Sequence, residues 1–493
     1  MKLKLKNKGN EIQLLLMILI SISSQMFALY KSSYTAMHFG ATNVMDAYNY
    51  ALNIASFLFA FVTTGVTTVI IPAYVKKKNP RAINTFITII YGCIMVVMIA
   101  VYLFRYPLIS LLTNRDIQFQ QYFADFLVYA FIIQCIISFL AVTTAYYQCI
   151  NRYVIPKFIV LVTNLLVFFV LVIIRELTIE QYIEVLVLGS VINFIIDVAI
   201  AFKLGFRYTP KFLFKNTETK SLFLIFLPTL FSSGVYKIHT LVDTMIAANL
   251  GTGQLTILTY ATQIVNMVNT FVVSNLTVYA YPKIVARIQE KDGKRKLWDY
   301  AILFHAIICL IICGFIAVGD YGINLIFVRG SFGSSEGRIL YLCSCVYILG
   351  QQTNIIRDLV YRYFYANDDT KTTFFNSVIV SLLNIVLSII LVIPFGVYGV
   401  VIGTILSSAF SFVMILFRFN RTFVLGQEFK MAVIEYGKTI TASMITIIVI
   451  LIVKFISPLS NDIICFIAYG CITVTIYFIL LLIMKNKALK VRI

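Results

Sequence analysis

The fold is decided by residues 283–296, KIVARIQEKDGKRK, and by the segment that follows at 297–328, LWDYAILFHAIICLIICGFIAVGDYGINLIFV. The first part carries the largest group of Lys and Arg in the chain. The second part is apolar and exceeds the roughly 20 residues that a helix needs to cross a bilayer. A basic cluster beside such a segment is typical of the cytoplasmic end of a transmembrane helix. The same pairing recurs along the chain.

Long apolar segments fill almost the whole sequence, and about fourteen of them could each span a membrane as a helix. Their limits are 11–38, 46–75, 83–112, 119–149, 154–175, 180–205, 221–249, 254–282, 297–328, 337–366, 372–395, 398–420, 432–457 and 461–484. The 493-residue chain is 60% hydrophobic and 12% charged, with a mean hydropathy of +0.92, which is too apolar for a soluble domain. Only helices satisfy the backbone of runs this long in lipid, so we predict an all-α, polytopic membrane protein.

Basic residues alternate between the two ends of these segments. Every second junction is basic, with the main clusters at 2–8, 76–81, 203–220, 283–296, 418–430 and 485–492. The junctions between them offer little beyond Arg115, Arg175, Arg329 and Arg338. By the positive-inside rule the clusters face the cytoplasm. We therefore predict a multi-pass protein of the inner (cytoplasmic) membrane with both termini cytoplasmic.

The formal net charge of +19 is explained by these junctions. Lys and Arg at helix ends contact anionic membrane lipids, which we predict as partners, whereas nucleic acid is not expected. The nine cysteines lie mostly in apolar runs and form no CxxC pair, and the three histidines share no metal-ligand spacing, so we predict no metal site. The chain has no GxxxxGK[ST] loop and no nucleophile–base motif, so we expect neither an enzyme nor a cofactor. We interpret the first segment as an uncleaved helix rather than a signal peptide.

A weak internal repeat suggests how the helices are organised. Asn53 and Ser56 in the second segment match Gln263 and Asn266 in the eighth at a constant spacing. Parallel repeats are typical of transporters, with the substrate path between the halves, although a chance match of apolar helices is the alternative. We predict an N-terminal lobe at 1–205, a cytoplasmic linker at 206–220, a C-terminal lobe at 221–420 and a C-terminal helix pair at 421–493.

Several polar side chains lie at membrane depth, where each ionisable group costs about 2.5–3.5 kcal/mol to insert. The predicted substrate-binding residues are Lys31, Asp46, Asn53, Lys237, Asp243, Gln263, Asn266 and Arg357. The three cations would bind an anion in a polar cavity. Hydrogen bonding between helices is the alternative explanation for the neutral residues. The two aspartates could instead form structural ion pairs, and Asp46 could simply be interfacial.

Local motifs, taken in order, resemble a known family. They are Phe39-Gly40-Ala41, Asp46-Ala47, Asn151-Arg152-Tyr153, Leu227-Pro228, Asp243-Thr244, Arg329-Gly330, Phe364-Tyr365-Ala366 and Asp369-Thr370. Over nearly the whole chain their order and spacing resemble the MviN/MurJ-type lipid II flippases of the MOP exporter superfamily.

The resemblance implies fourteen helices in two six-helix lobes, a central cavity, and two C-terminal helices that form a groove for a lipid tail. The family's basic positions in the first and tenth helices fall on Lys31 and Arg357, and its acidic position in the second helix falls on Asp46. Other charged positions of the family fall on neutral residues here, including Gln25 and Gln263.

We therefore predict a flippase that moves a polyprenyl-diphosphate-linked saccharide, lipid II or a similar cell-wall precursor, by alternating access. Its partners would be the lipid-linked glycan and glycan-synthesis proteins. The alternatives are a capsule or O-antigen repeat-unit flippase, a cation-coupled multidrug exporter of the same superfamily, and a non-transporting membrane scaffold. A drug exporter would more naturally place an unpaired acidic residue than three cations in its cavity.

Overall fold

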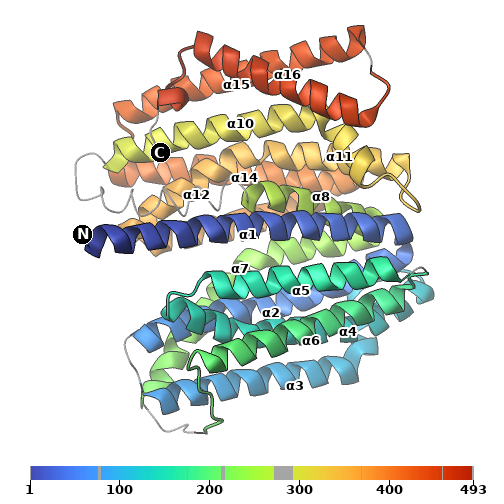
Figure 1. The fold of residues 1–493 in the computed structure, drawn as a ribbon, viewed down its shortest axis with the longest axis vertical. Helices are drawn as coiled ribbons and strands as arrows, with labels where there is room; N and C mark the ends of the chain where they lie inside the picture. Colours follow the sequence, from blue (N-terminus) through green and yellow to red (C-terminus); the bar gives the residue numbers. More distant parts are fainter. Residues whose placement is uncertain are drawn as a thin grey trace. The chain divides into compact units, whose positions relative to one another are not determined.

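A computed structural model describes residues 2–75, 79–174, 176–212, 217–270, 293–367, 369–457 and 459–490, and these are almost entirely helical (Figure 1). The chain forms two compact units. Unit 1 comprises Met1–Lys31 and Ala41–Thr256, and unit 2 comprises Ser32–Gly40 and Ile257–Ile493. The only strand-like pairing among the described residues is an isolated bridge between Arg329 and Phe332. The all-α prediction is confirmed.

Unit 1 is built around α2, which packs along α4 and α7. α3 packs against α4 and α7, and α6 packs against α4 and α5. Its helices are α1 (Lys2–Phe39, shared with unit 2), α2 (Asn43–Val75), α3 (Pro80–Leu112), α4 (Ile117–Cys149), α5 (Val154–Ile173), α6 (Ile179–Lys203) and α7 (Thr217–Asn249). The compact units divide between Thr256 and Ile257, and α7 packs along α2 and α3 within unit 1, whereas the sequence predicts a linker at 206–220. The two predicted transport lobes stay a prediction.

Unit 2 is built around α10, which packs against α11, α12, α15 and α16, while α14 packs on α13. Its helices are α8 (Gln254–Val268, which starts in unit 1), α10 (Gly293–Ile326), α11 (Ser334–Leu349), α12 (Gln351–Ala366), α13 (Thr370–Phe395), α14 (Val397–Phe423), α15 (Gln427–Ile456) and α16 (Asp462–Ile483). A short 3₁₀ helix, η2 (Lys487–Lys490), follows α16.

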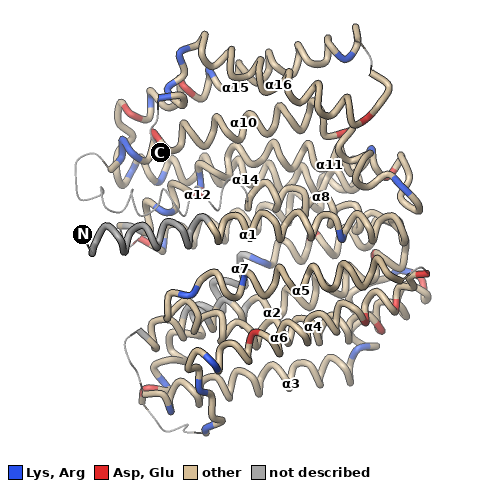
Figure 2. Tube along the Cα trace, viewed as in Figure 1, with Lys and Arg blue, Asp and Glu red and all other residues tan. Residues whose placement is uncertain are grey.

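Ten candidate membrane spans, judged by length and composition, occur in the described part of the chain: α3 to α6, α10, α13 to α16, and α11 with α12 taken together. They correspond to ten of the predicted segments. The other four fall on α1, α2, α7 and α8, and the last of these predicted segments continues beyond the described residues. In both units the charged residues gather toward the helix ends (Figure 2), as expected where helix centres face lipid.

One predicted segment, 337–366, is divided. α11 ends at Leu349 and α12 begins at Gln351, with Gly350 between them. A Cβ at Gly350 would lie 3.1 Å from Cγ1 of Ile405, so glycine allows α14 to approach the junction closely.

Glycine also permits a close backbone approach inside unit 2. The backbone amide of Ser331 donates to the carbonyl of Met37 at the end of α1, with an N···O distance of 2.8 Å. Gly40 and Gly330 both have positive φ, and a Cβ on either would lie within 2.4 Å of the opposing backbone. The structure thus brings together the Phe39-Gly40-Ala41 and Arg329-Gly330 motifs.

Candidate functional site

Asp46 lies in the first turn of α2 and is completely buried. Its carboxylate accepts hydrogen bonds from the Gly253 amide at 2.6 Å, from the Thr256 amide at 2.9 Å and from the Thr256 hydroxyl at 2.8 Å. It also forms an ion pair with Nη1 of Arg115 at 3.3 Å. The carboxylate therefore ties the start of α8 to the start of α2 within unit 1.

Arg115 completes this network from the loop between α3 and α4. Its guanidinium donates to the carbonyl of Ala248 at 3.2 Å and to the side chain of Asn43, and it lies 4.4 Å from the ring centroid of Phe119. Planar, delocalised charge suits both kinds of contact. We call the set Asn43, Asp46, Arg115, Gly253 and Thr256 the Asp46 network.

Sequence reasoning placed Arg115 only among the few basic residues on the outer side. The available signal was its isolation, as a lone cation at a junction otherwise poor in Lys and Arg. Nothing in the sequence pairs it with Asp46, because Asp46 lies in the first turn of α2 and Arg115 follows 69 positions later, in the loop between α3 and α4. The partner of Asp46 is thus Arg115 rather than a predicted cavity cation, and the role of Asp46 in substrate binding stays a prediction.

The remaining predicted residues of unit 1 differ in exposure. Lys31 is half-buried on α1, Lys237 is exposed on α7, and Asp243 is buried further along α7. Asn53, on α2, is half-buried. Its neighbour on the same helical stripe, Asn49, donates to the Thr256 hydroxyl at 3.2 Å and so joins the Asp46 network.

In unit 2, Gln263 and Asn266 lie on α8. The Gln263 side-chain oxygen accepts a hydrogen bond from the Ser32 hydroxyl at 2.6 Å, whereas Asn266 is exposed. The contact of Gln263 is of the helix–helix type that was the alternative to substrate binding.

Arg357 lies on α12 with its side chain only 13% exposed. Its guanidinium pairs with the Asp358 carboxylate at 3.2 Å and lies 5.7 Å from the ring centroid of Tyr361. The Tyr361 hydroxyl accepts from the Asn376 amide at 2.6 Å, and the same amide donates to the Ser411 hydroxyl at 2.8 Å. Contacts between polar side chains therefore connect Arg357 on α12 to Asn376 on α13 and, through it, to Ser411 on α14.

No group of three or more His, Cys, Asp or Glu among the described residues is arranged to hold a metal ion. The chemistry available at these positions is charge pairing and hydrogen bonding, which suits the recognition of a polar or anionic ligand.

Comparison with known proteins identifies the family. The model of the lipid II flippase MurJ family matches residues 35–469. The chain belongs to this family. It is 25% identical over 456 residues to a probable lipid II flippase MurJ of Borreliella burgdorferi, covering 87% of each chain. It is 23% identical over 410 residues to the probable lipid II flippase MurJ of Thermotoga maritima, covering 81% of this chain and 83% of the relative.

Solved structures show the same fold. A lipid II flippase MurJ in an inward closed conformation superposes with a TM-score of 0.81 at 20% identity, covering 95% of this chain and 98% of the other. An inward-facing multidrug resistance MATE family transporter of the MOP superfamily gives a TM-score of 0.65 at 13% identity, covering 82% and 98%. The predicted family resemblance is confirmed, and the protein is a multi-pass membrane protein with the MOP-superfamily fold.

Proposed function

We propose that this protein is a flippase that moves a polyprenyl-diphosphate-linked saccharide of the lipid II class across the cytoplasmic membrane by alternating access. The observation that carries the proposal is the match to the lipid II flippase family over residues 35–469. The protein then acts as a transporter rather than an enzyme, with the lipid-linked glycan as substrate and glycan-synthesis proteins as partners.

The diphosphate is bound by Lys31, Lys237 and Arg357. Lys237 is exposed on α7 and can meet a ligand without first leaving the protein interior. Arg357 presents a planar fork that suits bidentate recognition of phosphate. Its contact with Asp358, whose side chain is 39% exposed, is one that an incoming anion can replace. Asp243, which is buried on α7 in the same unit as Lys31 and Lys237, holds these two lysines in place.

The neutral residues Asn53, Gln263 and Asn266 contact the saccharide. For Gln263 this requires release of the hydrogen bond from Ser32. Asp46 takes a different part, because its carboxylate is fully occupied by the Asp46 network. It anchors the start of α8, and a contact with the substrate requires release of one of these bonds.

The driving force follows from the proposed orientation, with both termini in the cytoplasm. Each charge that crosses a potential of about 100 mV contributes about 2.3 kcal/mol. A dianionic headgroup moving outward from an inside-negative cell therefore gains about 4.6 kcal/mol, twice that figure. Export needs no nucleotide hydrolysis on this account.

The alternatives are a flippase for capsule or O-antigen units, a drug exporter and a scaffold. The structural similarity to a multidrug transporter, at 13% sequence identity, shows a shared fold and does not indicate a shared substrate. Two observations favour an anionic substrate over a cationic drug: the cations at the three predicted positions, and the ion pair that occupies the carboxylate of Asp46.

The test is a translocation assay in proteoliposomes with lipid II and with a second lipid-linked glycan. Lys237→Ala and Arg357→Ala should each slow transport at least tenfold, since a charge-assisted hydrogen bond contributes about 1.5–3 kcal/mol. Lys237→Arg should retain most activity. Arg338→Ala, which removes an exposed arginine, is the matched control. Normal transport by both alanine variants would remove the diphosphate-binding role. Transport of only the second glycan would reassign the substrate.

A further inference from the structure

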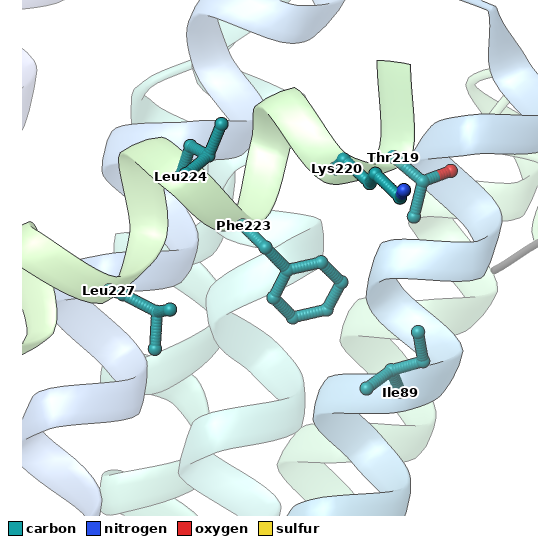
Figure 3. Close-up of a pocket in the computed structure, with 6 residues that line it drawn as sticks. All are labelled: Ile89, Thr219, Lys220, Phe223, Leu224 and Leu227. Atoms are coloured by element: carbon teal, nitrogen blue, oxygen red, sulfur yellow. The ribbon is translucent and has the colours of Figure 1, made fainter. Parts of the chain in front are cut away.

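The pocket in Figure 3 lies within unit 1, between α3 and the first turns of α7, and has a volume of about 310 Å³. It is lined by Ile89 from α3 and by Thr219, Lys220, Phe223, Leu224 and Leu227 from α7. The lining is almost entirely apolar and the Thr219 hydroxyl is buried, so the pocket does not by itself identify a ligand. The polar contacts around Arg357 in unit 2 are more informative.

Asn376 is completely buried on α13, yet its side chain bonds to two other helices. Its Nδ2 donates to the Tyr361 hydroxyl of α12 at 2.6 Å and to the Ser411 hydroxyl of α14 at 2.8 Å. Both bonds persist if the amide is turned over, because a hydroxyl can donate as well as accept. Since Asn376 has no exposed surface in this structure, any effect that it has on a ligand passes through the residues that it contacts.

Tyr361 connects this buried amide to Arg357, the position that is proposed to bind the diphosphate. The two residues are four apart on α12 and therefore lie on the same face of the helix. The guanidinium carbon is 5.7 Å from the ring centroid of Tyr361. A cation is attracted to the face of an aromatic ring, and the planar guanidinium also stacks on it. The ring therefore contacts Arg357 through its face and α13 through its hydroxyl.

Asp358 also holds the guanidinium, but its contact is less protected. Its carboxylate is 3.2 Å from Nη2 of Arg357, and its side chain is 39% exposed. When an anion replaces this carboxylate, as the proposed function requires, the contact with the Tyr361 ring is retained. The ring can then keep the planar fork of Arg357 in the orientation that a bidentate contact with phosphate needs.

We propose that Asn376 is a positioning residue for the substrate: through the Tyr361 ring it holds the Arg357 guanidinium in the orientation that binds the diphosphate. This role rests on the proposed function, in which Arg357 binds that group. A side chain that is fixed before binding loses less conformational freedom when the ligand arrives, so Asn376 raises the affinity for the diphosphate. A bond that only joined α12, α13 and α14 would affect stability and leave this affinity unchanged.

Affinity is measured by microscale thermophoresis on the purified full-length protein in one detergent, with two probes. One probe is a water-soluble lipid II with a short prenyl chain, and the other is farnesyl diphosphate, which has a diphosphate but no saccharide. Tyr361→Phe removes only the hydroxyl, and Asn376→Leu removes the amide at similar size. Each should raise the dissociation constant for both probes by about two- to tenfold, the range that one hydrogen bond contributes.

Two further variants separate positioning from helix packing. Ser411→Ala removes the other hydroxyl that Asn376 contacts and leaves the bond to Tyr361, so it should keep the parental affinity for both probes. In an Arg357→Ala background, Tyr361→Phe should cause no further loss, because the side chain that it positions is absent. If Asn376→Leu does not fold, Tyr361→Phe carries the test alone, since it keeps the ring.

Parental affinity in Tyr361→Phe overturns the proposal, as does an equal loss in Ser411→Ala or strict additivity with Arg357→Ala. A loss for lipid II without a loss for farnesyl diphosphate also overturns it, and would assign Tyr361 to direct contact with the saccharide. If Arg357→Ala binds farnesyl diphosphate as the parent does, the diphosphate-binding role of Arg357 itself fails. If Arg357→Ala weakens binding and Tyr361→Phe does not, only the positioning role fails.

Discussion

Arg115→Ala should destabilise the protein strongly although it lies far along the chain from the proposed substrate-binding residues. The substitution removes the counter-charge of Asp46, which is 0% exposed, while the side chain of Arg115 itself is only 11% exposed. Loss of one partner of a buried ion pair costs about 3–5 kcal/mol, because the other charge stays buried.

The remaining contacts of Asp46 set the size of the effect. Three donors, the amides of Gly253 and Thr256 and the Thr256 hydroxyl, still hold the carboxylate, so we expect the lower half of that range, about 3–4 kcal/mol. Asp46→Asn keeps an acceptor for Thr256 but removes the charge, and should cost about 1.5–3 kcal/mol. The double variant leaves no unpaired charge. Its cost should fall below the sum of the single costs by about 1–3 kcal/mol.

The free energy of unfolding is measured by denaturant titration in one fixed detergent, with Arg338→Ala as an exposed arginine control that should behave as wild type. A change of less than about 0.5 kcal/mol for Arg115→Ala, the range of ordinary surface substitutions, would refute the reasoning. Strictly additive costs in the double variant would show that the two side chains do not interact.

Three further predictions follow from other parts of the chain. A cysteine at Lys203 should be labelled only from the cytoplasm and one at Ser334 only from outside in intact cells, and the reverse result would invert the topology. Glu435→Ala should speed tryptic cleavage after α16, because the buried Glu435 carboxylate accepts from the backbone amide at the start of η2 at 2.9 Å; unchanged cleavage would count against this anchor. Cysteines at Asn53 and Gln263 should crosslink in one transport state and arrest transport until reduced, and continued transport by a fully crosslinked protein would show that α2 and α8 do not gate the path.

The sequence predicted the helices well because their signals are local. Apolar runs of membrane length and basic clusters between them locate ten spans that the structure also contains. Helix starts follow the same logic: Asn79 caps α3 before Pro80, and Thr178 and Gln181 form a capping box at α6. The division at Gly350 was missed, since a lone glycine inside an apolar run does not by itself predict a break.

By itself, the sequence determined the class of the protein, the spans and the family, because hydropathy, charge and motif order are properties of consecutive residues. Only the tertiary structure decided that Asp46 pairs with Arg115, that α7 belongs with α2, and that the first turn of α7 forms a pocket with α3. The reason is physical. The spacing of apolar residues predicts which face of a helix is apolar. Many other helices could pack against such a face equally well, so the sequence does not identify the neighbour. The partner of a buried charge is likewise determined only when the helices pack together.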